Sequence, residues 1–283
     1  MINLFRLGKS QASPVKLPDM SSLDAITRQL PDGYYSTFRT YSGGTRVIGL
    51  SAHLHRLPDV DGSALRRSLI QLLEPYRPGE ERIRVLETKQ RHVYVAIEPL
   101  KLLPRDVYEK GVRVETTSIQ RINPREKSTT FISASNDERN HIAQAGIFEA
   151  LLVKDGKILE GMTSNFFYVL RAERASTALV ARTAPHSAQR GILYTAQKNI
   201  LLGVTRTMLI RAARGRGVDV RYRALEMRQL RTVKEAFITS SSRGVVPVIQ
   251  IDDVRVGQGR VGRVTKELIR AYAEYVNRRA EKI

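Results

Sequence analysis

The chain of 283 residues is 42% hydrophobic and 27% charged, so it can bury a sizeable core and does not have the composition of a disordered protein. It contains no cysteine, which excludes disulfides, thiolate zinc sites and a cysteine nucleophile. Its net charge is +19, the basic residues are scattered along the chain, and only 6% of the residues are aromatic. Without a recognised nucleic-acid motif or an aromatic platform, a solvated basic face is favoured over a polynucleotide site.

The sequence predicts no targeting or membrane segment. Residues 1–6 lack a long apolar region, and no apolar run in the chain approaches the roughly 18 residues of a membrane span. We therefore expect a cytoplasmic protein.

The first third of the chain alternates strand patterns with one helix pattern. Strands are predicted over residues 34–41, 46–50 and 82–97, with a turn near residues 90–91 inside the last of these. Leucines at helical spacing predict a helix over residues 64–73.

The residues that follow predict a linker and then a second domain. Residues 99–104 are bounded by prolines and resist regular structure, which makes them the candidate linker. A strand over 112–116 and a helix over 137–145 come next, and strands and helices alternate after them. The pattern predicts a two-domain α+β or α/β protein, with a small α/β domain over residues 1–103 and a larger α/β domain over residues 104–283.

The most informative stretch is residues 160–167, Glu-Gly-Met-Thr-Ser-Asn-Phe-Phe. Glu160 is predicted at the end of a strand, before a small-residue turn and the strand-like residues 166–170. A carboxylate held there suits a cationic ring nitrogen, and Lys127 supplies an amine elsewhere in the chain. An ordinary hairpin with an exposed glutamate explains the stretch equally well on these observations.

Three further segments are candidates to hold a phosphate. Gly203 precedes a predicted helix, and the N–H groups of Val204 and Thr205 would be unsatisfied donors at its positive end. Residues 237–244 form a strand that runs into a hydroxyl-rich turn, and Arg56 lies on a short helical turn. A plain helix start, a solvated loop and a surface charge are the alternatives. No Walker or dinucleotide fingerprint occurs in the sequence, which disfavours a nucleotide.

These segments occur in an order that resembles the class IV aminotransferases, which include branched-chain and D-amino-acid aminotransferases and 4-amino-4-deoxychorismate lyase. The shared motifs are His-Leu-x-Arg-Leu (53–57), Pro-x-x-Lys (124–127), Glu-Ala-Leu-Leu with Glu-Gly-x-x-Ser-Asn-x-Phe (149–167), Gly-x-Thr-Arg (203–206) and Phe-x-Thr-Ser-Ser with Pro-Val (237–248). The resemblance runs from about Asp32 to Thr265. It implies a two-domain fold type IV enzyme, similar to D-amino-acid aminotransferase, that uses pyridoxal 5′-phosphate and forms a homodimer.

The resemblance also implies roles for individual residues. Lys127 resembles the catalytic lysine that binds the cofactor aldehyde and moves a proton, for which its amine must be neutral. Glu160 resembles the partner of the pyridine nitrogen. The implied phosphate ligands are Arg56, the backbone of Val204 and Thr205, and Ser241. The implied cofactor-binding set is Arg56, Lys127, Glu160, Thr163, Val204, Thr205, Ser240 and Ser241. The implied substrate-binding set is Tyr35, Arg39 and Ser242, and no metal is implied.

The chain departs from the family pattern at several positions. Ser36 stands where a glutamate is common, and the strand at 94–99 lacks an arginine that helps to set substrate recognition in relatives. The tyrosine that follows the lysine in branched-chain enzymes has no counterpart after Lys127. The connection over residues 171–190 is longer and more basic than the family normally has. The sequence therefore specifies the cofactor better than the substrate.

The sequence favours a transaminase that moves an amino group between an amino acid and a 2-oxo acid. Branched-chain or other hydrophobic L-amino acids are the first expectation for the donor. An aminodeoxychorismate lyase, which would release pyruvate with the same lysine, is the alternative on this fold. A basic binding protein that has lost catalysis is the third, although such a protein need not keep Lys127 and Glu160. We expect small-molecule partners and no nucleic acid or membrane.

Overall fold

The computed structural model describes residues 1–8, 11–170 and 192–283. The basic connection that the sequence predicts over residues 171–190 lies outside the described residues. Among those residues, no helix is both long and apolar enough to cross a membrane.

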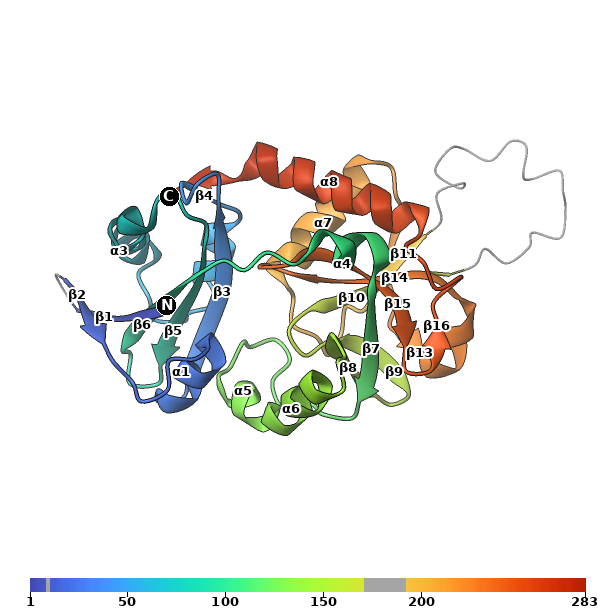
Figure 1. Cartoon of the computed structure of the whole chain (residues 1–283), viewed down its shortest axis with the longest axis horizontal. Coiled ribbons are helices and arrows are strands. Elements are labelled where there is room, and N and C mark those ends of the chain that lie inside the picture. Colours follow the sequence, from blue (N-terminus) through green and yellow to red (C-terminus); the bar gives the residue numbers. More distant parts are fainter. Residues whose placement is uncertain (9–10, 171–191) are drawn as a thin grey trace, which may run out of the picture. The chain divides into compact units, whose positions relative to one another are not determined.

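The chain divides into two compact units (Figure 1). Unit 1 consists of Met1–Leu102, Glu126–Asn136 and Val276–Ile283, and unit 2 consists of Leu103–Arg125 and Asp137–Tyr275. The first boundary lies close to the linker that the sequence predicts. The structure differs from the predicted division because two later segments pack with unit 1, one of which contains Lys127.

Backbone pairing over long sequence distances explains this difference. Ser128 forms an isolated bridge with Tyr34, and Glu281 pairs with Val47. Pairing of this kind leaves no periodic signal in the sequence of either segment, so a pattern read along the chain cannot assign the segment to its unit.

Unit 1 is built on one sheet whose order is β17-β4-β3-β5-β6-β1-β2, with antiparallel neighbours throughout. The strands are β1 (Asn3–Leu7), β2 (Ala12–Val15), β3 (Gly33–Tyr41), β4 (Arg46–Val47), β5 (Glu81–Thr88), β6 (Val93–Pro99) and β17 (Glu281–Lys282). The helices are α1 (Leu23–Gln29), α2 (Leu50–Leu54), α3 (Gly62–Leu73) and α5 (Thr130–Ala134), with a 3₁₀ turn η1 at Glu74–Tyr76.

Local sequence accounts for most of these elements. The Asp61 side chain caps the first turn of α3, and Leu65, Leu69 and Leu73 bury the apolar face that the sequence predicts. The prediction of a strand over 46–50 is wrong beyond Val47, because Gly49 adopts a left-handed conformation with φ of 64° and α2 begins at the next residue.

Unit 2 contains more strands than unit 1 in the part of the chain that the structure describes. Its strands are β7 (Val112–Thr117), β8 (Glu149–Lys154), β9 (Lys157–Gly161), β10 (Asn165–Leu170), β11 (Leu193–Thr195), β12 (Val220–Tyr222), β13 (Leu225–Glu226), β14 (Val233–Ser240), β15 (Gly244–Ile251) and β16 (Val254–Arg255). Its helices are α4 (Arg105–Lys110), α6 (Asn136–Gln144), α7 (Val204–Gly215), the 3₁₀ helix η2 (Met227–Thr232) and α8 (Arg263–Arg279), and α6 begins and α8 ends in residues of unit 1.

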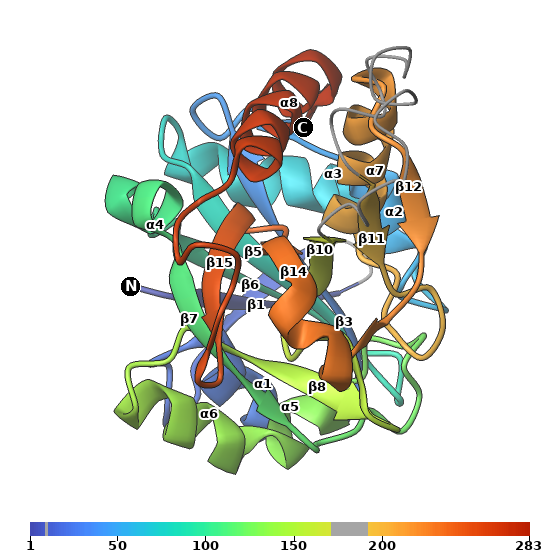
Figure 2. The same cartoon turned by 90° about the vertical axis from the view of Figure 1, so that its right-hand side faces the viewer.

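Six strands of unit 2 close into a barrel-like sheet. They follow the order β10-β14-β15-β7-β8-β9, and β9 pairs back onto β10 through Glu160 and Asn165. The interior is a core cluster that includes Leu151, Tyr168 and Ile238. Helices α7 and α8 lie on one side of β14 and β10, and α6 lies on the other side of the sheet, as both views show (Figures 1 and 2). The closing pair places Glu160 at the end of β9, where the sequence predicts it.

Candidate active site

Backbone hydrogen bonds hold Lys127 against the start of β3 in unit 1. The carbonyl of Lys127 accepts from Tyr35 N at 2.9 Å, and Thr129 N donates to the carbonyl of Gly33 at 2.9 Å. The Lys127 Nζ atom lies 4.9 Å from the centroid of the Tyr35 ring. The structure thus brings together Lys127 and Tyr35, which the sequence assigns to catalysis and to the substrate.

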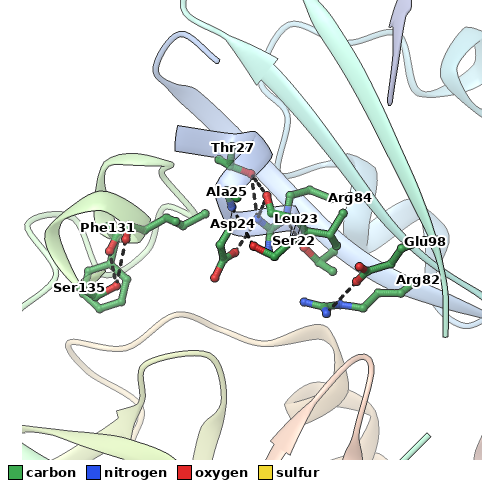
Figure 3. Close-up of polar contacts among 12 residues, drawn as sticks. Ser22, Leu23, Asp24, Ala25, Thr27, Arg82, Arg84, Glu98, Phe131 and Ser135 are labelled. Carbon is green, nitrogen blue, oxygen red and sulfur yellow. Dashed lines mark hydrogen bonds and ion pairs between the residues drawn. The ribbon is translucent and has the colours of Figure 1, made fainter. Parts of the chain in front are cut away.

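A buried arginine lies on the same ring. Arg84 on β5 places its Cζ 4.7 Å from the Tyr35 ring centroid. Its Nη1 donates to helix α1, at the Leu23 carbonyl, Asp24 Oδ1 and Thr27 Oγ1, over 2.7–2.9 Å (Figure 3). Because α1 holds the guanidinium from three acceptors, Arg84 supports the Tyr35 ring in a fixed position.

The sequence predicts no role for Arg84. It lies on the strand next to the one at 94–99, between the buried Ile83 and Val85, and is itself only 5% exposed. A charged residue inside a run of apolar residues was the available signal, because an arginine is almost never fully buried without partners.

His53 lies within the electrostatic influence of two predicted site residues of unit 1, Arg56 and Lys127. Its ring is buried, and Nδ1 lies 2.9 Å from the Oγ atom of Ser36, the residue that replaces the usual glutamate. Burial lowers the pKa of His53 well below its usual value, and the positive charges of Arg56 and Lys127 lower it further. His53 is therefore neutral at pH 7, with Arg56 and Lys127 both close enough to act on it.

Arg39 lies farther along β3, and the structure does not bring it to Lys127. Its guanidinium pairs with Glu80 and lies 4.5 Å from the Tyr41 ring centroid. Arg39 is four positions along the strand from Tyr35, so their Cα atoms are roughly 13 Å apart.

Glu160 is 2% exposed in unit 2 and is surrounded by hydrogen-bond donors. Arg121 Nε donates to Oε1 at 3.1 Å, Asn165 Nδ2 donates to Oε2 at 3.1 Å, and Leu201 N lies 3.1 Å from both oxygens. Arg121 also donates to the carbonyl of Met162 at 2.6 Å. The alternative of an exposed hairpin glutamate is wrong, since this carboxylate is buried and paired.

The start of α7 packs against the residues that hold Glu160. Asn165 Nδ2 also donates to the Leu201 carbonyl at 2.8 Å, and a Cβ atom on Gly203 would lie 2.1 Å from Asn165 Oδ1. Gly203 is therefore required for this close approach. No side chain of the described residues caps α7, and Thr205 Oγ1 lies 3.3 Å from Ser241 Oγ. The sequence places the helix start correctly, and the structure brings Thr205 and Ser241 together.

Thr163 and Ser240 belong to a second polar cluster of unit 2. Thr163 donates to Glu149 from both its N (2.9 Å) and its Oγ1 (2.8 Å). Ser240 Oγ accepts from Arg243 Nε at 3.0 Å. Ser242 lies in the turn between β14 and β15, next to these residues in sequence. Glu149 and Arg243 have no role that the sequence predicts.

The polar groups around Glu160 and the start of α7 fit a cofactor with an anionic group and a cationic ring nitrogen. Thr239 Oγ1 is buried without a hydrogen-bond partner among the described residues, and Thr239 pairs with Asn165 across β14 and β10. The uncapped N–H groups of α7 add further donors, as expected for an anion site. No group of three or more His, Cys, Asp or Glu side chains in the described part of the chain could hold a metal ion.

The chain is similar to known proteins of one family. The family profile "Amino-transferase class IV" matches residues 33–251. The chain is 28% identical over 266 residues to a Methanocaldococcus jannaschii protein provisionally named as a branched-chain-amino-acid aminotransferase. The alignment covers 84% of each chain. It is 28% identical over 127 residues to the D-alanine aminotransferase of Bacillus licheniformis, which covers 44% of this chain and 38% of that protein.

The fold is also shared with solved structures. The branched-chain amino acid aminotransferase of T.th., solved with pyridoxamine 5′-phosphate, superposes with a TM-score of 0.75 at 20% identity, over 99% of this chain and 97% of that one. The predicted two-domain fold type IV class is thereby confirmed. Because the family profile spans most of the chain and includes Tyr35, Lys127, Glu160 and Ser241, this protein belongs to the class IV aminotransferases.

Proposed function

We propose that the chain is a pyridoxal 5′-phosphate transaminase that moves an amino group from a branched-chain or other hydrophobic L-amino acid to a 2-oxo acid. The observation that carries the proposal is the buried carboxylate of Glu160, held by Arg121, Asn165 and the Leu201 N–H at the closing pair of the barrel. A carboxylate fixed in this way is suited to a protonated ring nitrogen.

Bound pyridoxal 5′-phosphate would supply an aldehyde carbon and a ring that withdraws electrons from the substrate Cα. In this proposal Lys127 would supply the amine that holds the cofactor aldehyde and the base that takes the proton from the substrate Cα. The positive charges of Arg56 and Lys127 both act on the buried, neutral His53. The uncharged form of the Lys127 amine is the one that can act as nucleophile and base.

The phosphate would be held by Arg56, the N–H groups of Val204 and Thr205, and Ser241 Oγ. The uncapped start of α7 and the contact between Thr205 and Ser241 support this assignment. Thr163 and Ser240 are the further cofactor-binding residues in the proposal.

The donor specificity is proposed from the surroundings of Tyr35. Its ring packs in an apolar cluster with Leu86 and Ile132, next to the Lys127 amine. An apolar wall beside the reacting amine favours hydrophobic side chains of the donor. Arg39 and Ser242 remain the candidates for polar contacts with the substrate, and the relatives named for branched-chain amino acids support the same donor class.

The test is the visible absorption of the purified protein with a panel of L- and D-amino acids, with and without a 2-oxo acid. We expect a yellow band that hydrophobic L-amino acids bleach and that 2-oxoglutarate restores. Bleaching by D-amino acids alone would contradict the proposed donor. Pyruvate release from aminodeoxychorismate without any acceptor would establish the lyase instead. A protein that stays colourless with added pyridoxal 5′-phosphate would overturn the proposal altogether.

We also propose a homodimer, following the family resemblance. Light scattering at micromolar concentration should give twice the chain mass of 31.9 kDa. A fully active monomer would contradict this part of the proposal.

A further inference from the structure

Arg243 lies in the turn between β14 and β15, directly after the hydroxyl run 240–242. Its guanidinium contacts three segments of unit 2 at once. The Nε atom donates to Ser240 Oγ at 3.0 Å, while Nη2 donates to Glu149 Oε2 at 2.7 Å and to Thr163 Oγ1 at 2.5 Å. The Cζ atom lies 5.2 Å from the centroid of the Phe148 ring. One side chain therefore joins β14, the start of β8 and the loop after β9.

Glu149 is the anchor of this arrangement. Its side chain is 2% exposed, and it accepts from Arg243 and from both the N and the Oγ1 of Thr163. A buried carboxylate with these donors stays in one position, since the loss of the Arg243 cation would leave a buried charge poorly compensated. Arg243 is 22% exposed, so the pair is shielded from most of the solvent.

Two hydroxyls at the turn between β14 and β15, those of Ser240 and Ser241, contact different parts of unit 2. Ser241 Oγ lies next to Thr205 at the start of α7, whereas Ser240 Oγ accepts from Arg243. Ser240 is the last residue of β14 and Ser241 the first residue of the turn, and the two hydroxyls have different partners. Tyr108 Oη also donates to the Arg243 carbonyl at 2.9 Å and fixes the backbone of the turn.

We propose that Arg243 is a positioning residue that couples the phosphate-binding turn at Ser240 and Ser241 to the loop that follows Glu160. The coupling runs from Ser240 through the Arg243 guanidinium to Glu149 and Thr163. This inference rests on the proposed function, because it assigns the turn and the loop to the same cofactor. Arg243 itself does not contact the cofactor; it keeps Ser241 and Thr163 in the arrangement that binds it.

The test compares Arg243→Ala, Arg243→Gln and Arg243→Lys in the full chain. Pyridoxal 5′-phosphate and pyridoxal, which lacks the phosphate, are titrated into the apoprotein, and the dissociation constants are measured from absorbance. For Arg243→Ala we expect the constant for pyridoxal 5′-phosphate to rise about tenfold, the loss expected for one charge-assisted hydrogen bond. The constant for pyridoxal should change by less than about twofold, because Glu149 still holds Thr163 through two hydrogen bonds, whereas the freed turn would hold only the phosphate.

The conservative variants and a surface control separate positioning from general stability. Arg243→Lys keeps the ion pair with Glu149 and should restore part of the affinity, while Arg243→Gln should not. Arg255→Ala, an exposed arginine on β16, should leave both constants unchanged. Equal losses for pyridoxal and its phosphate, or no loss in Arg243→Ala, would overturn the inference.

Amide hydrogen exchange of the apoprotein provides a second measurement that needs no cofactor. Protection should fall at residues 240–244 in Arg243→Ala and stay unchanged in the core strand β10. Unchanged protection in the turn would overturn the inference. A wild-type protein that does not bind pyridoxal 5′-phosphate would contradict the proposed function instead, and with it the link from the turn to a cofactor, even if the exchange result held. If Arg243→Ala does not fold, Arg243→Gln takes its place in both measurements.

Discussion

The two units hold their candidate residues by different physical means. In unit 1 the Lys127 amine lies over the Tyr35 ring, and its charge acts together with that of Arg56 on the buried, neutral His53. In unit 2 the surroundings of Glu160 are hydrogen-bond donors from Arg121, Asn165 and a backbone N–H. In unit 1 burial and two positive charges keep the His53 ring neutral, whereas in unit 2 the donors around Glu160 stabilise its negative charge.

Because of this difference, we expect substitutions at Lys127 and substitutions around Glu160 to have different effects. A ring and nearby charges act over several ångströms without a fixed direction, and the Tyr35 ring is also held by Arg84, so it should keep its place without the Lys127 amine. Hydrogen bonds to a buried carboxylate are directional, and the removal of one donor leaves an unsatisfied charge. We therefore expect activity to be more sensitive in unit 1 and folding to be more sensitive in unit 2.

The largest effect should come from Lys127→Ala. We expect the transamination rate to fall at least about 10⁴-fold, since nucleophile and base are lost together, while the free energy of unfolding changes by less than about 1 kcal/mol. Steady-state rates and urea unfolding measure the two quantities. A variant with substantial residual activity would remove Lys127 from its proposed role, and a strong loss of stability would break the contrast between the units.

Arg121→Met should have the largest effect on folding. The Arg121 and Glu160 side chains are 7% and 2% exposed, so breaking the pair should cost about 3–5 kcal/mol of unfolding free energy. The control is Arg228→Ala, which breaks a pair between Glu226 and an Arg228 side chain that is 83% exposed, and which should leave the denaturation midpoint nearly unchanged. Equal denaturation midpoints for the two variants would show that Glu160 does not depend on this partner.

Gly203→Ala should cause a smaller loss through steric conflict. The added Cβ would lie 2.1 Å from Asn165 Oδ1 and should displace Asn165 from Glu160, at a cost of about 1–3 kcal/mol. Gly215 ends the same helix with nothing within 4 Å of its Cβ position, so Gly215→Ala should be neutral or stabilising by up to about 1 kcal/mol. Thermal unfolding of both variants measures the difference, and a destabilised Gly215→Ala would point to a backbone effect rather than a clash.

The smallest effect is a pH dependence that arises from His53. Its lowered pKa means that the unfolded chain binds a proton that the folded chain rejects, so stability is lost as the pH falls below about 6.5. The slope attributable to His53 should reach about 1.4 kcal/mol per pH unit. His53→Gln should remove it.

The difference between wild type and His53→Gln is the quantity to measure. Burial raises the pKa values of Glu81 and Glu87 in the same unit, and their effect on stability has the opposite sign. Urea unfolding from pH 7.5 down to pH 5 measures the difference, which should grow steadily below pH 6.5. A constant difference over that range would mean that His53 accepts its proton in the folded state.

The features that could be predicted from the sequence have local patterns. A small-residue turn before a strand-like run placed Glu160 at the end of a strand, and Gly203 marked the start of α7. The order of five short motifs then indicated the family, which the family profile confirms over residues 33–251. These signals are contained in stretches of a few residues, so reading along the chain is enough to find them.

The features that could not be predicted depend on residues far apart in the sequence. Arg121 and Glu160 are separated by 39 positions, and Arg243 and Glu149 by 94. Neither arginine differs in its local pattern from the many exposed arginines of this basic chain. The pairing of Ser128 with Tyr34 likewise has no periodic signal, which is why Lys127 was expected in the other domain.

The position of β17 has a consequence for the synthesis of the protein. Glu281 pairs with Val47, and its carboxylate binds Arg66, while the Ile283 carbonyl accepts from Arg77 at 2.7 Å. The ribosome delivers these partners only after every residue of unit 2 has been translated. All residues of unit 2 are therefore available while unit 1 still lacks the edge strand that Glu281 and Lys282 form.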